Sequence, residues 1–348
     1  MTEADCLTRE LASCQSFRQN ARAWLQKTPR EPGAPLRAVE AGDGHVVVAE
    51  AARCPDALSC EEVLVLRGDL TTGTGCRFTR HLYVGGNCRI GQGSQLEAIA
   101  AEGDLDLGSG VSVRLWAHSR GILEIHTRAT IEQEVSSETA IRLGLDVTAG
   151  SLSGPEVGTQ SWEEGIAPPP CEPPTEFIEI PSPSGAGAPD SLSLPGVDPM
   201  RLFPMGPQTW VYNGDLHLEK PLILHAKLVV DGSFSCPAHS RLEDDVRSAN
   251  SIHTGPNSVI GAQLIARTDL VLGPGCVFHS GLRAGKTLRL CRGVVGGKHG
   301  STVEVSACGS LMLESGVVIR GKLSAGGKVV TVTTQPPQTE PPKPAKKK

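Results

Sequence analysis

The sequence repeats a six-residue unit in which two apolar residues flank one other residue and a short turn follows. In the stretch 269–284, DLVLGPGCVFHSGLRA, the apolar pairs are Leu270/Leu272, Cys276/Phe278 and Leu282/Ala284. Alternate residues of a strand point to one face, so each pair turns both side chains to the same side. A helix would repeat every ~3.6 residues and hairpin strands would be separated by longer turns, so neither explains this spacing.

The same phase extends over most of the chain in two series. The first covers about 45–149, with a slip of one residue after Leu96, and the second covers about 208–333, with an insertion at 298–301. Three such sides make a turn of ~18 residues in a triangular parallel β-helix, a solenoid whose strands stack ~4.8 Å apart. The predicted fold is therefore all-β, with two triangular parallel β-helix domains of about six turns each and a short N-terminal α-helix.

The remaining segments divide the chain further. Apolar residues at helical spacing over 3–27 predict an amphipathic helix, expected to cap the open first turn; a partner-binding or coiled-coil segment and a membrane-surface anchor are the alternatives. The expected organisation is a helix or cap at 1–30, a first β-helix at 45–149, a Pro-rich linker at 150–207, a second β-helix at 208–333 and a disordered Pro- and Lys-rich tail at 334–348. The end of the linker is expected to dock on the second β-helix through Leu202, Phe203, Met205, Trp210 and Tyr212.

Composition narrows the class of protein. The net charge is −5 and there is no broad basic field, which argues against nucleic acid as the main partner. The chain has 11 cysteines, and several of them occupy inward positions of the repeat, which favours a reducing cytosol over a disulfide scaffold. No signal-peptide core and no apolar run of ~18 residues is present, so a cytoplasmic location is expected.

The histidines are the only candidates for catalysis. Solenoids of this kind occur in acyltransferases with a catalytic histidine and in zinc enzymes with three converging histidines. No three of the ten histidines share a corner on adjacent turns, so neither a metal site nor a bound cofactor is expected. A lone acyl-transfer histidine is most plausible at His118, His253 or His279, although a surface position is the ordinary explanation. The prediction is that the protein is not an enzyme.

Two segments carry a resemblance to a known family. GAQLIARTDLVLGPGCVFHSGLRAG (261–285) and VVIRGKLSAGGKVV (317–330) resemble bactofilins, the bacterial polymer-forming cytoskeletal proteins. The resemblance implies nucleotide-free assembly into filaments or sheets and the scaffolding of envelope or morphogenetic proteins, with weak peripheral membrane contact left open. A typical member has one such domain, whereas this chain has two, and its helix and linker could cover the ends that a filament needs.

The end turns are the expected site of assembly. An end turn presents unpaired backbone N–H and C=O groups around an apolar cross-section, so it templates another end. The residues expected to take part in this stacking are Val46, Val48, Leu323 and Val329. We therefore predict a structural polymer that associates with itself and with other scaffold or envelope-biogenesis proteins. A trimeric hexapeptide-repeat-type acyltransferase and a monomeric solenoid interaction module are the alternatives.

Overall fold

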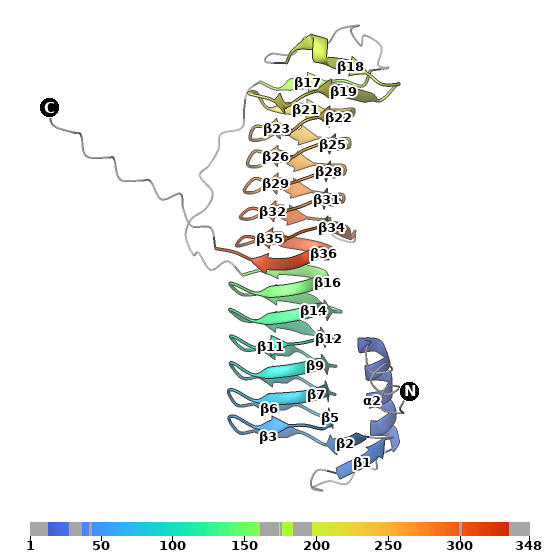
Figure 1. Ribbon diagram of the computed structural model, residues 1–348, viewed down its shortest axis with the longest axis vertical. Coiled ribbons are helices and arrows are strands. Elements are labelled where there is room, and N and C mark those ends of the chain that lie inside the picture. Colours follow the sequence, from blue (N-terminus) through green and yellow to red (C-terminus); the bar gives the residue numbers. More distant parts are fainter. Residues whose placement is uncertain are drawn as a thin grey trace, which may run out of the picture.

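The described residues form one upright rod of stacked β-strands with an α-helix beside its lower half (Figure 1). The computed structural model describes residues 13–27, 37–41, 44–160, 174, 176–183, 197–298 and 301–333. The strands form a parallel β-solenoid of about 14 turns. At ~4.8 Å per turn the rod is roughly 65 Å long.

The first run of turns uses residues 44–159 and has three sides. Side one contains β3 (Ala52–Cys54), β6 (Leu70–Thr72), β8 (Cys88–Ile90), β10 (Leu105–Leu107), β13 (Ile122–Ile125) and β15 (Ala140–Leu143). Side two contains β4 (Ser59–Cys60) and β11 (Ser112–Val113), and side three contains β2 (Gly44–Ala49), β5 (Val63–Leu66) and β12 (Trp116–Ser119). Longer strands turn from side two into side three: β7 (Arg77–Val84), β9 (Gln95–Ala101), β14 (Thr130–Ser137) and, continuing back to side one, β16 (Thr148–Thr159).

The second run uses residues 178–331 and is built in the same way. Side one contains β20 (Leu216–His217), β23 (Phe234–Cys236), β26 (Ile252–Thr254), β29 (Leu270–Leu272), β32 (Leu288–Leu290) and β35 (Leu311–Leu313). Side two contains β17 (Ile178–Ile180), β21 (Leu222–Leu224), β24 (Arg241–Leu242), β27 (Val259–Ile260), β30 (Val277–Phe278) and β33 (Val295–Gly296). Side three contains β19 (Thr209–Asn213), β22 (Lys227–Asp231), β25 (Val246–Ser248), β28 (Leu264–Ala266), β31 (Leu282–Ala284) and β34 (Val303–Ala307), and β36 (Val318–Thr331) closes all three sides.

The six-residue phase fills the core as the sequence predicts. Leu270 lies in register between Ile252 and Leu288 on neighbouring turns, and all three are fully buried. Serines in inward positions are satisfied by the backbone: the Ser240 hydroxyl accepts a hydrogen bond from the amide of Leu222 and donates to the carbonyl of Pro237. Buried polar groups with such partners cost little, so serine is tolerated in an otherwise apolar channel.

The corners are fixed by glycine and by Asp/Asn side chains. Gly75 and Gly275 adopt φ of 67° and 68°, a left-handed conformation that a Cβ would disfavour. At another corner, the carboxylate of Asp69 accepts a hydrogen bond from the amide of Asn87 on the next turn, and the side chain of Asn87 accepts one from the amide of Asp104. Each turn is thereby tied to its neighbour outside the strands.

The structure does not show a division into two six-turn domains. The buried side chains of both runs belong to one continuous apolar core. The first run extends through β16 to Thr159, beyond the boundary expected near residue 149, because its last strand pairs with the end of the second run. The expected tail at 334–348 lies outside the described residues, as do 161–173, 175 and 184–196 of the expected linker. The described part of that linker contains the end of β16 and the whole of β17, which pair with strands of the solenoid.

The helix is not the end cap that the sequence suggested. Helix α2 (Cys14–Lys27) lies along the outer surface of side three in the first run, parallel to the long axis of the rod (Figure 1). The predicted residues 3–12 lie outside the described ranges. The first turn is instead edged by β1 (Arg37–Ala41), which pairs antiparallel with β2. Helix α2 binds the side because that surface is apolar, as the next section describes.

Candidate functional site: the ends of the solenoid

The two runs meet end to end within the chain. Strand β16 closes the first run, β36 closes the second, and the two pair antiparallel along all three sides of the triangle. Leu152 lies opposite Leu323, and Ala149 lies opposite Val329. All four side chains are buried. Leu323 and Val329, which the sequence suggested as end-stacking residues, therefore lie at a contact between two solenoid ends of the same chain.

Two threonines make matching contacts across this junction. The Thr159 hydroxyl donates to the carbonyl of Glu314 at 2.7 Å and accepts from the amide of Val317 at 2.9 Å. The Thr331 hydroxyl donates to the carbonyl of Gly144 and accepts from the amide of Val147, both at 2.8 Å. Each run therefore caps the last corner of the other, and the junction has approximate two-fold symmetry.

Within the described part of the chain, no strand or helix covers sides one and two at the outer end of the first run. We call its inward-facing first-turn side chains the mouth, which comprises Val47, Ala49, Ala52, Cys54, Leu58 and Cys60. Each packs on the core but is partly exposed, whereas the next turn, which includes Leu64, Leu66 and Phe78, is buried. Among the described residues, β3 and β4 each pair with a strand on one edge only. This end therefore offers both apolar surface and unpaired strand edges.

Val46 and Val48 do not face the mouth. Both are buried against helix α2 on the outer surface, and the alternate residues of the same strand, Val47 and Ala49, point into the core. Strand β2 pairs Val46 with Val63, so the first turn is out of phase by one residue with the predicted inward series. A shift of one residue exchanges the two faces of a strand.

At the outer end of the second run the apolar core is covered, although among the described residues β17 and β20 also pair with a strand on one edge only. The 3₁₀ helix η1 (Pro199–Arg201) leads into β18 (Leu202–Pro204), which pairs antiparallel with β19 at the top of the rod (Figure 1). Trp210 and Tyr212 are buried beneath it, and the indole N–H of Trp210 donates to the carbonyl of Pro181 at 2.8 Å. Leu202 is buried as well, so the expected docking of this segment is confirmed for Leu202, Trp210 and Tyr212.

The outer surface of this end is apolar. We call Met200, Phe203 and Met205 the tip, and their exposed fractions are 90%, 40% and 68%. Phe203 and Met205 therefore do not dock inward as expected. Large exposed apolar side chains that gather at one place mark interaction surfaces more often than isolated ones do. The rod thus ends in the mouth on one side and a protruding apolar tip on the other.

Helix α2 covers a third apolar surface. Phe17 and Ala21 are fully buried against outward-facing residues of side three: Val46, Val48, Val65, Tyr83, Ala98, Ala100 and Trp116. The ring of Phe17 lies 5.0 Å from that of His81 and 5.7 Å from that of Trp116, centroid to centroid. The sequence carries a trace of this surface, because strands such as 63–66 (VLVL) are apolar on both faces. A strand that is buried on both faces needs a covering element.

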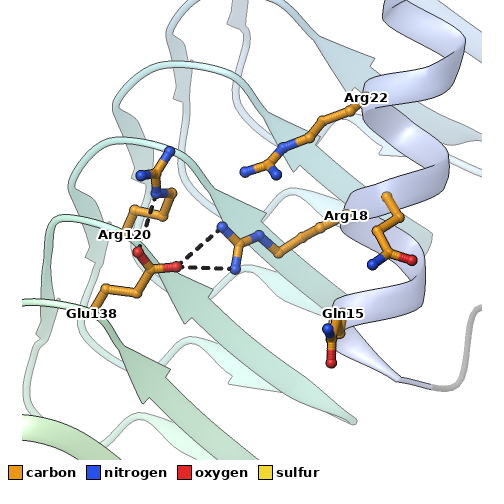
Figure 2. Close-up of a pocket in the computed structure, with 6 residues that line it drawn as sticks. Gln15, Arg18, Arg22, Arg120 and Glu138 are labelled. Atoms are coloured by element: carbon orange, nitrogen blue, oxygen red, sulfur yellow. Dashed lines mark hydrogen bonds and ion pairs between the residues drawn. The ribbon is translucent and has the colours of Figure 1, made fainter.

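Charged residues fix the helix at its exposed edge. Arg18 contacts Glu102 at 3.2 Å and Glu138 at 3.3 Å, and Arg120 contacts the same two carboxylates from the solenoid. Figure 2 shows Arg18 and Arg120 converging on Glu138 beside the helix. Burial opposes ionisation of Glu102, but hydrogen bonds from Arg22 and Arg18 outweigh it and lower its pKa to about 2. The group is therefore held ionised against the arginines.

The candidate histidines are not brought together. His118 lies beneath helix α2, where its Nδ1 is 2.9 Å from the hydroxyl of Ser136. Burial, followed by the nearby Arg18, lowers its pKa to about 4. His253 is exposed on β26, and His279 follows β30 on a different turn. Within the described ranges, no group of three His, Cys, Asp or Glu side chains has the arrangement of a metal site.

The described part of the chain contains no helix with the length and apolarity needed to span a bilayer.

Comparison of the chain with protein-family models, with curated proteins and with solved structures found no match.

Proposed function

We propose that this protein is a structural scaffold of the bactofilin type, which assembles with itself through the ends of its solenoid and needs no nucleotide to do so. The junction between β16 and β36 is the observation that carries the proposal. It is an example, within one chain, of two solenoid ends that satisfy each other through strand pairing and apolar contact.

The physical basis is the chemistry of a solenoid end. Every interior turn pairs with a turn above and a turn below, whereas an end turn leaves one edge without a strand partner. At the junction this edge is covered along all three sides, and the inward residues Leu152 and Leu323 are fully buried. The first turn of the first run has the same chemistry and is only partly covered, by β1. It is the natural place for a second copy to bind.

The wider role is part of the same proposal. A stiff rod that joins end to end provides regularly spaced side surfaces, on which other scaffold or envelope-biogenesis proteins could be positioned in the cytoplasm. The terminal KPAKKK sequence would allow weak contact with an acidic membrane surface.

The test is the mass of the purified full-length protein as its concentration rises. The proposal expects light scattering to report a mass that increases from ~1 to ~100 μM, and negative-stain images to show rods joined at their ends. A compact trimer that binds acyl-CoA would favour the acyltransferase alternative. A constant monomer mass over the whole range would contradict self-assembly and leave a monomeric interaction module.

A further inference from the structure

We propose that assembly is directional: the tip of one copy binds the mouth of the next. This inference rests on the proposed self-assembly and adds which surfaces meet. It follows from two facts about the same rod: the mouth and the tip lie at opposite ends (Figure 1), and their side chains differ in size in a complementary way.

The inward side chains of the mouth are apolar, mostly small and partly exposed. Leu58 is the largest of its six inward residues. The other five are Val47, Ala49, Ala52, Cys54 and Cys60. The turn immediately inside contains Leu64, Leu66, Leu70 and Phe78, so the channel is filled by large side chains one turn deeper. Small residues at the end of a channel leave room for side chains from outside.

The tip supplies side chains of the opposite kind. Met200, Phe203 and Met205 are three of the four large apolar residues that are highly exposed within the described ranges. They fall within six residues, on a short unit whose own core beneath them is closed. Methionine is flexible and polarizable, which suits it to filling an irregular hollow.

Contacts between like ends satisfy these surfaces less well. Two mouths placed together would oppose small side chains to small side chains and leave voids, which forfeits packing energy. Two tips placed together would leave both mouths in contact with water. A tip in a mouth covers both surfaces at once, and such a head-to-tail contact does not close, so it propagates along the rod axis.

The expected contact is weak in isolation. A side of about six residues at ~3.3 Å each is ~20 Å long, so the triangular end presents only a few hundred Å², below the ~800 Å² per partner of a stable complex. The association is therefore expected to depend on concentration in the micromolar range. A lipid bilayer is the less favoured occupant of the tip, because the carboxylate of Asp198, which accepts a hydrogen bond from the amide of Met200, would have to leave water.

The experiment uses full-length protein with one end altered at a time. The tip variant carries Phe203→Glu and Met205→Glu, and the mouth variant carries Ala52→Glu. Controls place glutamate on outward positions: Val259→Glu, which is 39% exposed on β27, for the tip, and Arg53→Glu, on the same strand β3, for the mouth. Far-UV circular dichroism and thermal unfolding identify variants that fold like the wild type, and Leu58→Lys replaces the mouth variant if Ala52→Glu does not fold.

Directional assembly has a distinctive outcome. Each end variant alone should stay at monomer mass at concentrations where the wild type and the controls grow. A mixture of the two variants should form one-to-one pairs and stop, because only one tip and one mouth remain functional. Dimers of the tip variant alone would show mouth-to-mouth contact, and dimers of the mouth variant alone would show tip-to-tip contact; either result overturns the inference while self-assembly survives.

Two further results would also decide the question. Growth of both variants like the wild type would show that neither surface is used, which overturns the inference. Alternatively, the wild type floats with phosphatidylcholine vesicles while the tip variant does not. If assembly were then also unaffected by the tip substitutions, the tip would be a lipid contact and the inference would be overturned. A wild type that never exceeds monomer mass would contradict the proposed function itself.

Discussion

Thr159 and Thr331 occupy equivalent positions on the two sides of the junction, and the hydroxyl of each bridges an amide and a carbonyl of the opposite run. Both side chains are buried. A buried hydroxyl that serves as donor and acceptor at once satisfies two buried backbone groups. The junction is therefore held by specific polar contacts at two corners in addition to strand pairing.

Replacing either threonine by valine should weaken the junction. The substitution keeps the shape but removes the hydroxyl bonded to one buried N–H and one buried C=O, so each variant should lose about 1–3 kcal/mol of unfolding free energy. Urea unfolding followed by circular dichroism measures the loss. Hydrogen exchange should locate it at 144–159 and 314–331.

The matched control for this change is Thr302→Val at an exposed position. It should change stability by less than ~0.5 kcal/mol. If Thr159→Val and Thr331→Val were as mild as the control, the described hydrogen bonds would not be stabilising the junction.

Phe17→Ala should release helix α2 without unfolding the solenoid. Truncating a fully buried phenylalanine costs about 3–5 kcal/mol, and few other residues of the helix are buried. The expected result is fast amide exchange over 14–27 and a red shift in the fluorescence of Trp116, with the thermal transition of the rod retained. Gln19→Ala, on the exposed face of the helix, should leave the amide exchange, the Trp116 fluorescence and the thermal transition unchanged. A helix that stays protected in Phe17→Ala would contradict the packing described.

The attachment of helix α2 should weaken in acid. The pKa of His118 is lowered from 6.5 to about 4 by burial and by Arg18, so the attached state favours the neutral imidazole. The released state then binds more protons, and the stabilisation present above pH ~6.5 is lost as the pH falls towards ~4. The lowered pKa of Glu102 extends the loss from about 4.5 towards 2, because its ionised form pairs with arginine.

Hydrogen exchange of α2 as a function of pH, corrected for intrinsic rates, measures this dependence. His118→Gln should flatten the profile between pH 6.5 and 4. His217→Gln is the matched control, because His217 makes the same kind of contact with a serine hydroxyl, Ser235, but on an exposed surface. An unchanged profile in His118→Gln would exclude this histidine as the titrating group.

The cysteines should react according to their place in the solenoid. Burial raises the pKa of Cys236 to about 12 and also raises that of Cys88, whereas Cys308 is exposed. A thiol reagent added to the native protein should therefore label Cys308 ahead of the other cysteines in the described ranges, and the two inward cysteines only after unfolding. Peptide mass spectrometry reads the order, and rapid labelling of Cys88 in the native protein would contradict its position in the core.

The six-residue repeat predicted correctly which side chains fill the core, but it did not predict which side chains face inward at the ends of the rod. Pairs such as Leu270/Leu272 and Leu282/Ala284 are buried where the phase places them, because inward direction on a strand follows from local alternation. Val46 and Val48 are reversed since the first turn is short by one residue, and a single slip exchanges the faces.

The junction and the helix surface depend on contacts between distant segments. Nothing local in 148–159 or 318–331 specifies that these strands meet antiparallel, because that pairing satisfies backbone groups and leaves the inward phase unaltered. The outward apolar residues around Tyr83 and Trp116 are a sequence signal of a covered surface, but they do not specify the covering element, and the helix was expected at the end turn instead. Phe203 and Met205 were expected to dock but are exposed, since composition does not distinguish a covered apolar side chain from an exposed one.

The central claim, that two solenoid ends meet within one chain, can be tested by crosslinking across the junction. Ser151 and Ser324 lie opposite each other on β16 and β36. In the variant Ser151→Cys with Ser324→Cys, a short bifunctional maleimide should join 151 to 324 within one molecule, as identified by peptide mass spectrometry at monomer mass. The control pair Ser151→Cys with Ser251→Cys, which places the second cysteine several turns away, should give no such product. Absence of the 151–324 crosslink, or its formation only between copies, would contradict the continuous rod and the scaffold proposal that rests on it.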